Sequence, residues 1–136
     1  NEEKMRLAIG EIEKAIALNS SRAVYHYGLA RLYQKMRKPE EAKREYEQAV
    51  KEDSSNPYFQ MFYAIFCFNR AILEHAVFEK KIISTEMFKE GLRAYYNARE
   101  IDPAMNLTRF REYMAGYDFL KEVFEKEGLL VPDRQF

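Results

Sequence analysis

The chain has 136 residues, 47% of them hydrophobic, and its 22 basic and 22 acidic residues give a formal net charge of +0. This length predicts one domain, residues 1–136, and the lack of a net positive charge argues against nucleic acid as a partner. The single cysteine excludes an internal disulfide, and no uncharged apolar run reaches the roughly 18 residues of a membrane span. The polar start has no signal-peptide pattern, so we expect a cytoplasmic location and no membrane partner.

The first predicted element is a helix within residues 1–20, and its segment 12–21 matches residues 46–55 at an offset of 34. A third copy begins at residue 95. In each copy a small residue is followed by a bulky one, by Ala and by a turn residue: Ala8, Ile12, Ala15, Ser20; Ala42, Tyr46, Ala49, Ser54; Gly91, Tyr95, Ala98, Pro103. Because spacings of three and four share one helix face, each copy is predicted to be the second helix of an antiparallel pair. The first copy lacks its preceding helix.

The next two predicted helices, about 22–36 and 39–52, form a complete unit over residues 21–55. Ser20 or Ser21 is expected to cap the first, and Pro39 suits the first turn of the second. This unit resembles the tetratricopeptide (TPR) repeat through Leu29, Ala30, Tyr33, Ala42, Tyr46 and Ala49. The resemblance implies an all-α fold, a right-handed superhelix of antiparallel helix pairs with about six helices.

The third unit, residues 56–103, is enlarged, because Gly91 comes 15 residues later than the period predicts. Two extra turns on each helix would absorb the insertion, which predicts long helices over about 57–81 and 85–101 with Ser84 and Thr85 at the turn. A flexible loop is the competing interpretation. We expect apolar residues to seal the tip: Ile72, Ala76, Phe78, Ile82, Ile83, Met87 and Phe88. Residues 104–136 are predicted to form one capping helix ending near Gly128 and an apolar tail that folds back.

Catalytic or metal-binding patterns are not evident in the sequence. His26 and His75 have no partner at ligand or catalytic spacing, and Cys67 occupies a packing position. We therefore expect no enzyme activity, no cofactor and no metal. The basic cluster formed by Arg31, Lys35, Arg37 and Lys38 has two interpretations. Favourable charge at a helix C-terminus is preferred over binding of phosphate or an acidic peptide.

The resemblance to TPR proteins implies that the first helix of each pair lines a concave surface that holds a protein or peptide. The corresponding residues are Val24, Tyr27, Arg31, Lys35, Tyr58, Met61, Ile65, Phe68 and Asn69. Tyr27, Met61 and Phe62 argue against a clamp for a terminal carboxylate and favour an apolar or amphipathic segment with some acidic character. The alternative is a structural or oligomerisation segment whose groove is filled by its own cap or tail. Self-association through the first helix is a further possibility, at Leu7, Ile9, Ile16 and Leu18.

Overall fold

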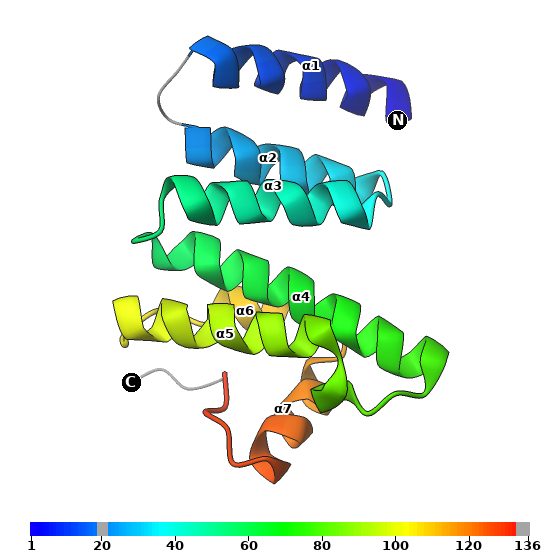
Figure 1. Cartoon of the computed structure of the whole chain (residues 1–136), viewed down its shortest axis with the longest axis vertical. Coiled ribbons are helices and arrows are strands. Elements are labelled where there is room, and N and C mark those ends of the chain that lie inside the picture. The colour runs from blue at the N-terminus through cyan, green and yellow to red at the C-terminus, as the bar shows by residue number, and fades with distance from the viewer. Residues whose placement is uncertain (19–21, 133–136) are drawn as a thin grey trace. The chain divides into compact units, whose positions relative to one another are not determined.

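A computed structural model describes residues 1–18 and 22–132, and within these ranges every regular element is helical (Figure 1). These elements are α1 (Glu2–Leu18), α2 (Arg22–Lys35), α3 (Pro39–Glu52), α4 (Pro57–Phe78), the 3-10 helix η1 (Ile82–Ser84), α5 (Glu86–Ile101), α6 (Thr108–Tyr113) and α7 (Tyr117–Lys126). The predicted all-α class is confirmed. The chain divides into two compact units, Asn1–Phe59 and Gln60–Phe136, where the sequence predicted one domain. Ser20 and Ser21, the predicted caps, lie outside the described residues.

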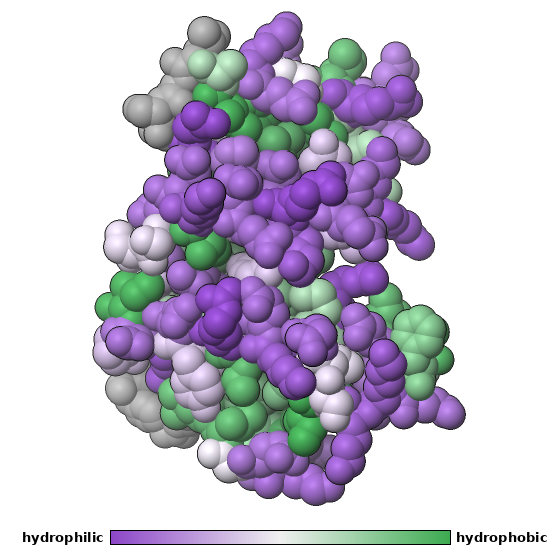
Figure 2. Space-filling model, in the orientation of Figure 1, coloured by the Kyte–Doolittle hydropathy of each residue, from purple (hydrophilic) through white to green (hydrophobic). Residues whose placement is uncertain are grey.

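In the first unit, α2 and α3 pack through small residues, as the repeat pattern predicts. Ala30 and Ala42 are fully buried, and Ala49 forms a small core with Ala23 and Phe59. Ala side chains at these positions allow the two helix backbones to approach closely. The outer face of α3 is solvated, and Figure 2 shows a mainly hydrophilic surface over this helix.

The connection from α2 to α3 is tight because Arg37 adopts a left-handed conformation with φ 58°. The amide of Lys38 then donates to the carbonyl of Tyr33 at 2.9 Å, which satisfies a carbonyl that the end of α2 would otherwise leave unpaired. Pro39 follows as the first residue of α3, where its missing N–H costs nothing. The predicted helix bounds here are correct to within one residue.

In the second unit, α4 and α5 are in close contact at Gly91. A β-carbon built on this glycine would lie 2.9 Å from Cδ1 of Phe68 and 3.1 Å from Cβ of Cys67. Phe68 is the centre of an aromatic cluster, with ring centroids 5.4 to 6.4 Å from those of its neighbours: Phe88, Tyr95, Phe110 and Phe124. The small residue of the third copy therefore admits a neighbouring helix, as predicted.

The insertion lengthens α4 but hardly changes α5. The helix α4 has 22 residues against 14 in α2, whereas α5 has 16 against 14 in α3. The prediction of two extra turns on each helix is therefore wrong for α5. The remaining insertion forms the link 79–81 and η1, and the hydroxyl of Thr85 caps α5 by accepting from the amide of Phe88 at 3.1 Å.

The predicted apolar seal at the tip forms only in part. Ile82 and Phe88 are buried, but Phe78 and Ala76 are exposed. These two residues are exposed because the end of α4 has no part of α5 opposite it. Phe68 of α4 contacts Phe88 near the beginning of α5, so in an antiparallel pair residues 73–78 extend past the first residue of α5. His75 on this stretch stacks on Phe119 with centroids 5.1 Å apart, so one face of the helix end is covered and the other is not.

The capping region consists of two short helices rather than the single predicted one. The chain breaks between α6 and α7 at Gly116, which has φ 71°, a conformation that favours glycine. Helix α7 ends as predicted near Gly128, where the amide of Leu129 donates to the carbonyl of Phe124 at 2.8 Å. The stretch Leu129–Pro132 then folds back, and Tyr95 donates its hydroxyl to the carbonyl of Leu130.

Of the helices in the described ranges, one, α4, is long and apolar enough to cross a membrane. A core helix passes the same test of length and composition. The burial pattern favours a core helix, because five of its side chains are at most 1% exposed: Tyr63, Ala64, Cys67, Phe68 and Ala71. The absence of a membrane partner stays a prediction.

Candidate functional site

Four of the predicted binding residues lie on one face of α2. Val24, Tyr27, Arg31 and Lys35 are spaced by three or four residues, which places them along one stripe of a helix. Val24 and Lys35 are exposed, and Tyr27 and Arg31 are partly exposed. The stripe therefore offers one apolar group, one aromatic ring and two cations to a partner.

Tyr27 is held in place by neighbours within the first unit. Its ring lies 5.8 Å from that of Phe59 and 6.2 Å from that of Tyr46, both centroid to centroid, and it packs on the core formed by Ala23, Ala49 and Phe59. Tyr58, the next predicted binding residue, directly precedes Phe59 and is exposed. The aromatic part of this surface is thus built on a fixed base, which lowers the entropy lost on binding.

Arg31 is oriented by Tyr27 one turn earlier. Its Nη1 donates to the hydroxyl of Tyr27 at 2.8 Å, and its guanidinium carbon lies 5.9 Å from the centroid of the same ring. A guanidinium has five N–H donors in a planar fork, a geometry that suits a carboxylate. Lys35, one turn further on, adds a second exposed cation.

The opposite side of α2 faces α3 through polar contacts. Nδ1 of His26 lies 2.6 Å from Oε1 of Glu45, and both side chains are largely buried. Burial, followed by the charges of Glu13, Glu45 and Glu41, raises the pKa of Tyr33 above its usual value. The folded unit therefore favours the neutral phenol, and the stability linked to it is lost as pH rises through the raised pKa. His26 therefore contributes a polar contact between α2 and α3.

The equivalent stripe of α4 is not available, which corrects three of the predicted binding residues. Met61, Ile65 and Phe68 are 5%, 6% and 0% exposed. Phe68 belongs to the aromatic core of the second unit.

Asn69 explains how part of this stripe is covered. Its Nδ2 donates to the carbonyl of Tyr113 at 3.2 Å, and its Oδ1 accepts from the amide of Ala115 at 2.9 Å. Phe62, two turns earlier on the same side of α4, contacts the ring of Tyr113 with centroids 6.3 Å apart. Ile65 lies between Phe62 and Asn69 on the helix surface. The link between α6 and α7 thus occupies this face of α4, as the alternative in the sequence analysis proposed.

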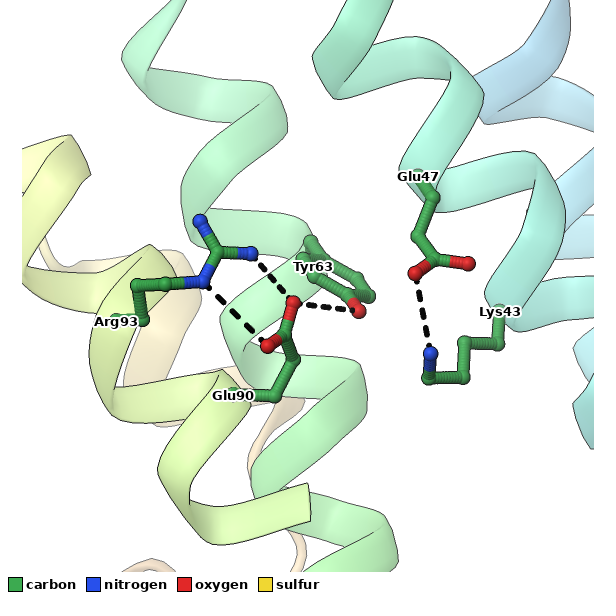
Figure 3. Close-up of polar contacts among 5 residues, drawn as sticks. All are labelled: Lys43, Glu47, Tyr63, Glu90 and Arg93. Atoms are coloured by element: carbon green, nitrogen blue, oxygen red, sulfur yellow. Dashed lines mark hydrogen bonds and ion pairs between the residues drawn. The ribbon is translucent and has the colours of Figure 1, made fainter. Parts of the chain in front are cut away.

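A partly exposed ion pair lies beside the α4–α5 contact (Figure 3). Arg93 forms two hydrogen bonds with the carboxylate of Glu90, and the hydroxyl of Tyr63 donates to Oε1 of the same group at 3.2 Å. The bond to Glu90 raises the pKa of Arg93 further above its ordinary value, so the guanidinium stays charged. Figure 3 also shows the exposed pair Lys43–Glu47, one turn apart on α3 and 3.1 Å apart. Both sets of charges are paired on the protein surface and serve structure.

Two sets of contacts were not anticipated from the sequence. Asn69 was assigned to a partner but holds the chain's own backbone, and Tyr95 and Tyr96 both bond to Leu130. The sequence gives one weak indication of the second set of contacts: the repeat pattern accounts for Tyr95 but not for the adjacent Tyr96. Within the described residues, no three His, Cys, Asp or Glu side chains are grouped in a way that could hold a metal.

The first helix shows little of the expected apolar patch. Leu7 is exposed, but Ile9 is buried and Ile16 is partly buried. Ile12 approaches α2 and would lie 3.6 Å from a β-carbon at Gly28. The side chain of Leu18 is outside the described part of the structure.

An antiparallel pair of helices joined by a tight link, with small residues at the contact, defines a helical-repeat unit. Comparison with known families identifies this unit: residues 23–56, 34 of the 136, match the tetratricopeptide repeat. The chain therefore carries a tetratricopeptide repeat, and the resemblance seen in the sequence is confirmed. Such repeats generally mediate protein–protein interaction and are typically not enzymes. No curated protein and no solved structure matches the chain.

Proposed function

We propose that the chain is a protein-binding module, and that the α2 face binds a partner segment with apolar and acidic side chains. The surface consists of Val24, Tyr27, Arg31 and Lys35, together with Tyr58, which directly precedes the Phe59 that contacts Tyr27. The observation that carries the proposal is the pairing of Arg31 with Tyr27, because it orients a cation on a fixed aromatic base beside an exposed apolar side chain. A carboxylate would bind at Arg31 and Lys35, and an apolar side chain at Val24 or Tyr58.

A peptide selection tests this proposal without a known partner. The intact chain is used to select ligands from a displayed library of 12-residue peptides, and one selected peptide is measured by fluorescence anisotropy. We expect enrichment of acidic and large apolar residues. Arg31→Glu should weaken binding at least tenfold, because it places a like charge against the acidic ligand. Arg44→Glu, the same charge change at an exposed position of α3, is the matched control and should bind like the wild type. Equal binding by the Arg31 variant would exclude this face.

A second candidate function is a structural segment of a larger assembly. It is favoured by the covered stripe of α4, where the chain's own backbone takes the place of a ligand at Asn69. Self-association through Leu7 on α1 belongs to this candidate. Light scattering over a hundredfold range of concentration separates the two, because the binding module needs no change of mass whereas self-association requires one.

A further inference from the structure

The stretch Leu129–Pro132, called the return segment below, is held on α5 by two consecutive tyrosines. The hydroxyl of Tyr95 donates to the carbonyl of Leu130 at 2.7 Å, and the amide of Leu130 donates to the hydroxyl of Tyr96 at 3.2 Å. Pro132 is among the largest fully buried side chains. Figure 1 shows this segment running back towards α5 after α7.

The contacts recognise backbone rather than a particular side chain. Both polar backbone groups of Leu130 are bound, while its side chain is 43% exposed and contributes little. Two residues later, a proline ring is buried, and proline fixes φ and favours an extended chain. These requirements describe a class of ligand: an extended segment with any residue at the bonded position and proline two residues after it.

The tyrosines are in place independently of the return segment. Tyr95 is fully buried, and its ring packs against Phe68, Phe110 and Phe124 of the core. The ring of Tyr96 lies 5.4 Å from that of Tyr95, centroid to centroid. The positions of the two rings are therefore set by α5 and the core rather than by the return segment.

The junction between α7 and the return segment allows the segment to leave α5 while α7 stays folded. The last turn of α7 is closed by the bond from Leu129 to Phe124 at 2.8 Å, and Gly128 has φ 70°. Release breaks the hydrogen bonds of Leu130 with Tyr95 and Tyr96 and exposes the ring of Pro132 and the partly buried side chains of Leu129 and Val131, whereas α7 keeps its own hydrogen bonds.

We propose that this face of α5 is a second peptide-binding site and that the return segment is its intramolecular occupant. A partner bearing an extended segment of the same chemistry, with proline at the second position after the bonded residue, displaces it. The site is separate from the α2 face, so it does not depend on the function proposed above.

A competition experiment tests the site. The probe is a fluorescein-labelled, amidated peptide of residues 127–132, Glu-Gly-Leu-Leu-Val-Pro, and anisotropy is measured against the intact chain and its variants. Pro132→Asp removes the buried ring from the internal occupant but leaves α5 unchanged. Since an internal competitor lowers the fraction of chains able to bind, this variant should bind the probe at least tenfold more tightly than the wild type. Adding Tyr96→Phe to it should weaken binding several-fold.

Two control variants isolate the cause. Leu130→Ser changes only an exposed side chain and should bind the probe like the wild type. Arg31→Glu alters the α2 face and should leave probe binding unchanged, so that failure at one surface is distinguished from failure at the other. If Pro132→Asp does not fold by circular dichroism, Leu130→Pro replaces it, because it removes the amide that donates to Tyr96 and restricts the backbone of the return segment, while α5 is unchanged. A folded variant that shows no saturable binding, or binding that is insensitive to Tyr96→Phe, overturns the proposal.

Discussion

Substitution of glycine by alanine should change the free energy of unfolding in opposite directions at two mid-helix positions, Gly10 and Gly91. Replacing Gly by Ala in a helix interior normally stabilises a protein by about 0.5–1 kcal/mol. At Gly10 a β-carbon meets nothing within 4 Å, so Gly10→Ala should show this full gain. At Gly91 the β-carbon would lie 2.9 Å from Phe68, which is fully buried, and the overpacking should cost about 1–3 kcal/mol. After the helix gain is subtracted, Gly91→Ala should lose roughly 0–2.5 kcal/mol, centred on about 1.25 kcal/mol.

Urea denaturation followed by circular dichroism measures both free energies. In thermal melts we expect the midpoint to rise by a few degrees for Gly10→Ala and to fall by roughly 5 °C for Gly91→Ala, at about 4 °C per kcal/mol. Gly91→Ser should be destabilising for the same reason, which separates steric overlap from helix propensity. If Gly91→Ala stabilises the chain as much as Gly10→Ala does, the close contact between α4 and α5 is refuted.

Phe88→Ala should cost about 3–5 kcal/mol because this side chain is 2% exposed in the aromatic core, whereas Phe78→Ala, at 66% exposed, should change the unfolding free energy by less than about 0.5 kcal/mol. If urea denaturation shows equal losses of unfolding free energy for the two variants, the burial of Phe88 and the exposure of Phe78 are contradicted. Asn69→Ala should cost about 1–2 kcal/mol through loss of two hydrogen bonds to backbone, and Asn69→Asp, which keeps the acceptor, should cost less. Hydrogen exchange at the Ala115 amide should speed up in Asn69→Ala and stay near the wild-type rate in Asn69→Asp. Unchanged exchange in both variants would argue against the hydrogen bond from the Ala115 amide to Asn69.

Much of the helical framework was predictable from spacing and helix-end residues. Pro39 marks the first residue of α3, and the predicted helices 22–36 and 85–101 end or begin within one residue of α2 and α5. These boundaries are local, because proline suits a first turn and a side-chain oxygen at Thr85 caps the amide of Phe88. Ala42, Tyr46 and Ala49 are all buried, since small and bulky groups on one stripe must face a neighbouring helix.

The irregular parts could not be predicted in the same way. The end of α4 at Phe78 is set by Glu79, which takes a left-handed conformation with φ 54°, and glutamate carries no signal for that conformation. The break between α6 and α7 falls at Gly116, inside an apolar stripe that continues through both helices. A single glycine within a helical pattern is compatible with either a continuous helix or a stop, and the contacts of Asn69 with the link decide the outcome.

The binding surface shows the limit of the repeat period. Tyr27 and Met61 are 34 residues apart, as are Arg31 and Ile65, so the period predicts the same helix face for the two members of each pair. A period describes how a helix is oriented, but not what covers it. On α2 that face is partly exposed at Tyr27 and Arg31, whereas on α4 the link after α6 binds Asn69, and Met61 and Ile65 are buried. Since the chain's own backbone binds Asn69 on α4, the α2 face is the less covered part of the proposed surface, and Arg31 on that face is the residue on which the proposed function is tested.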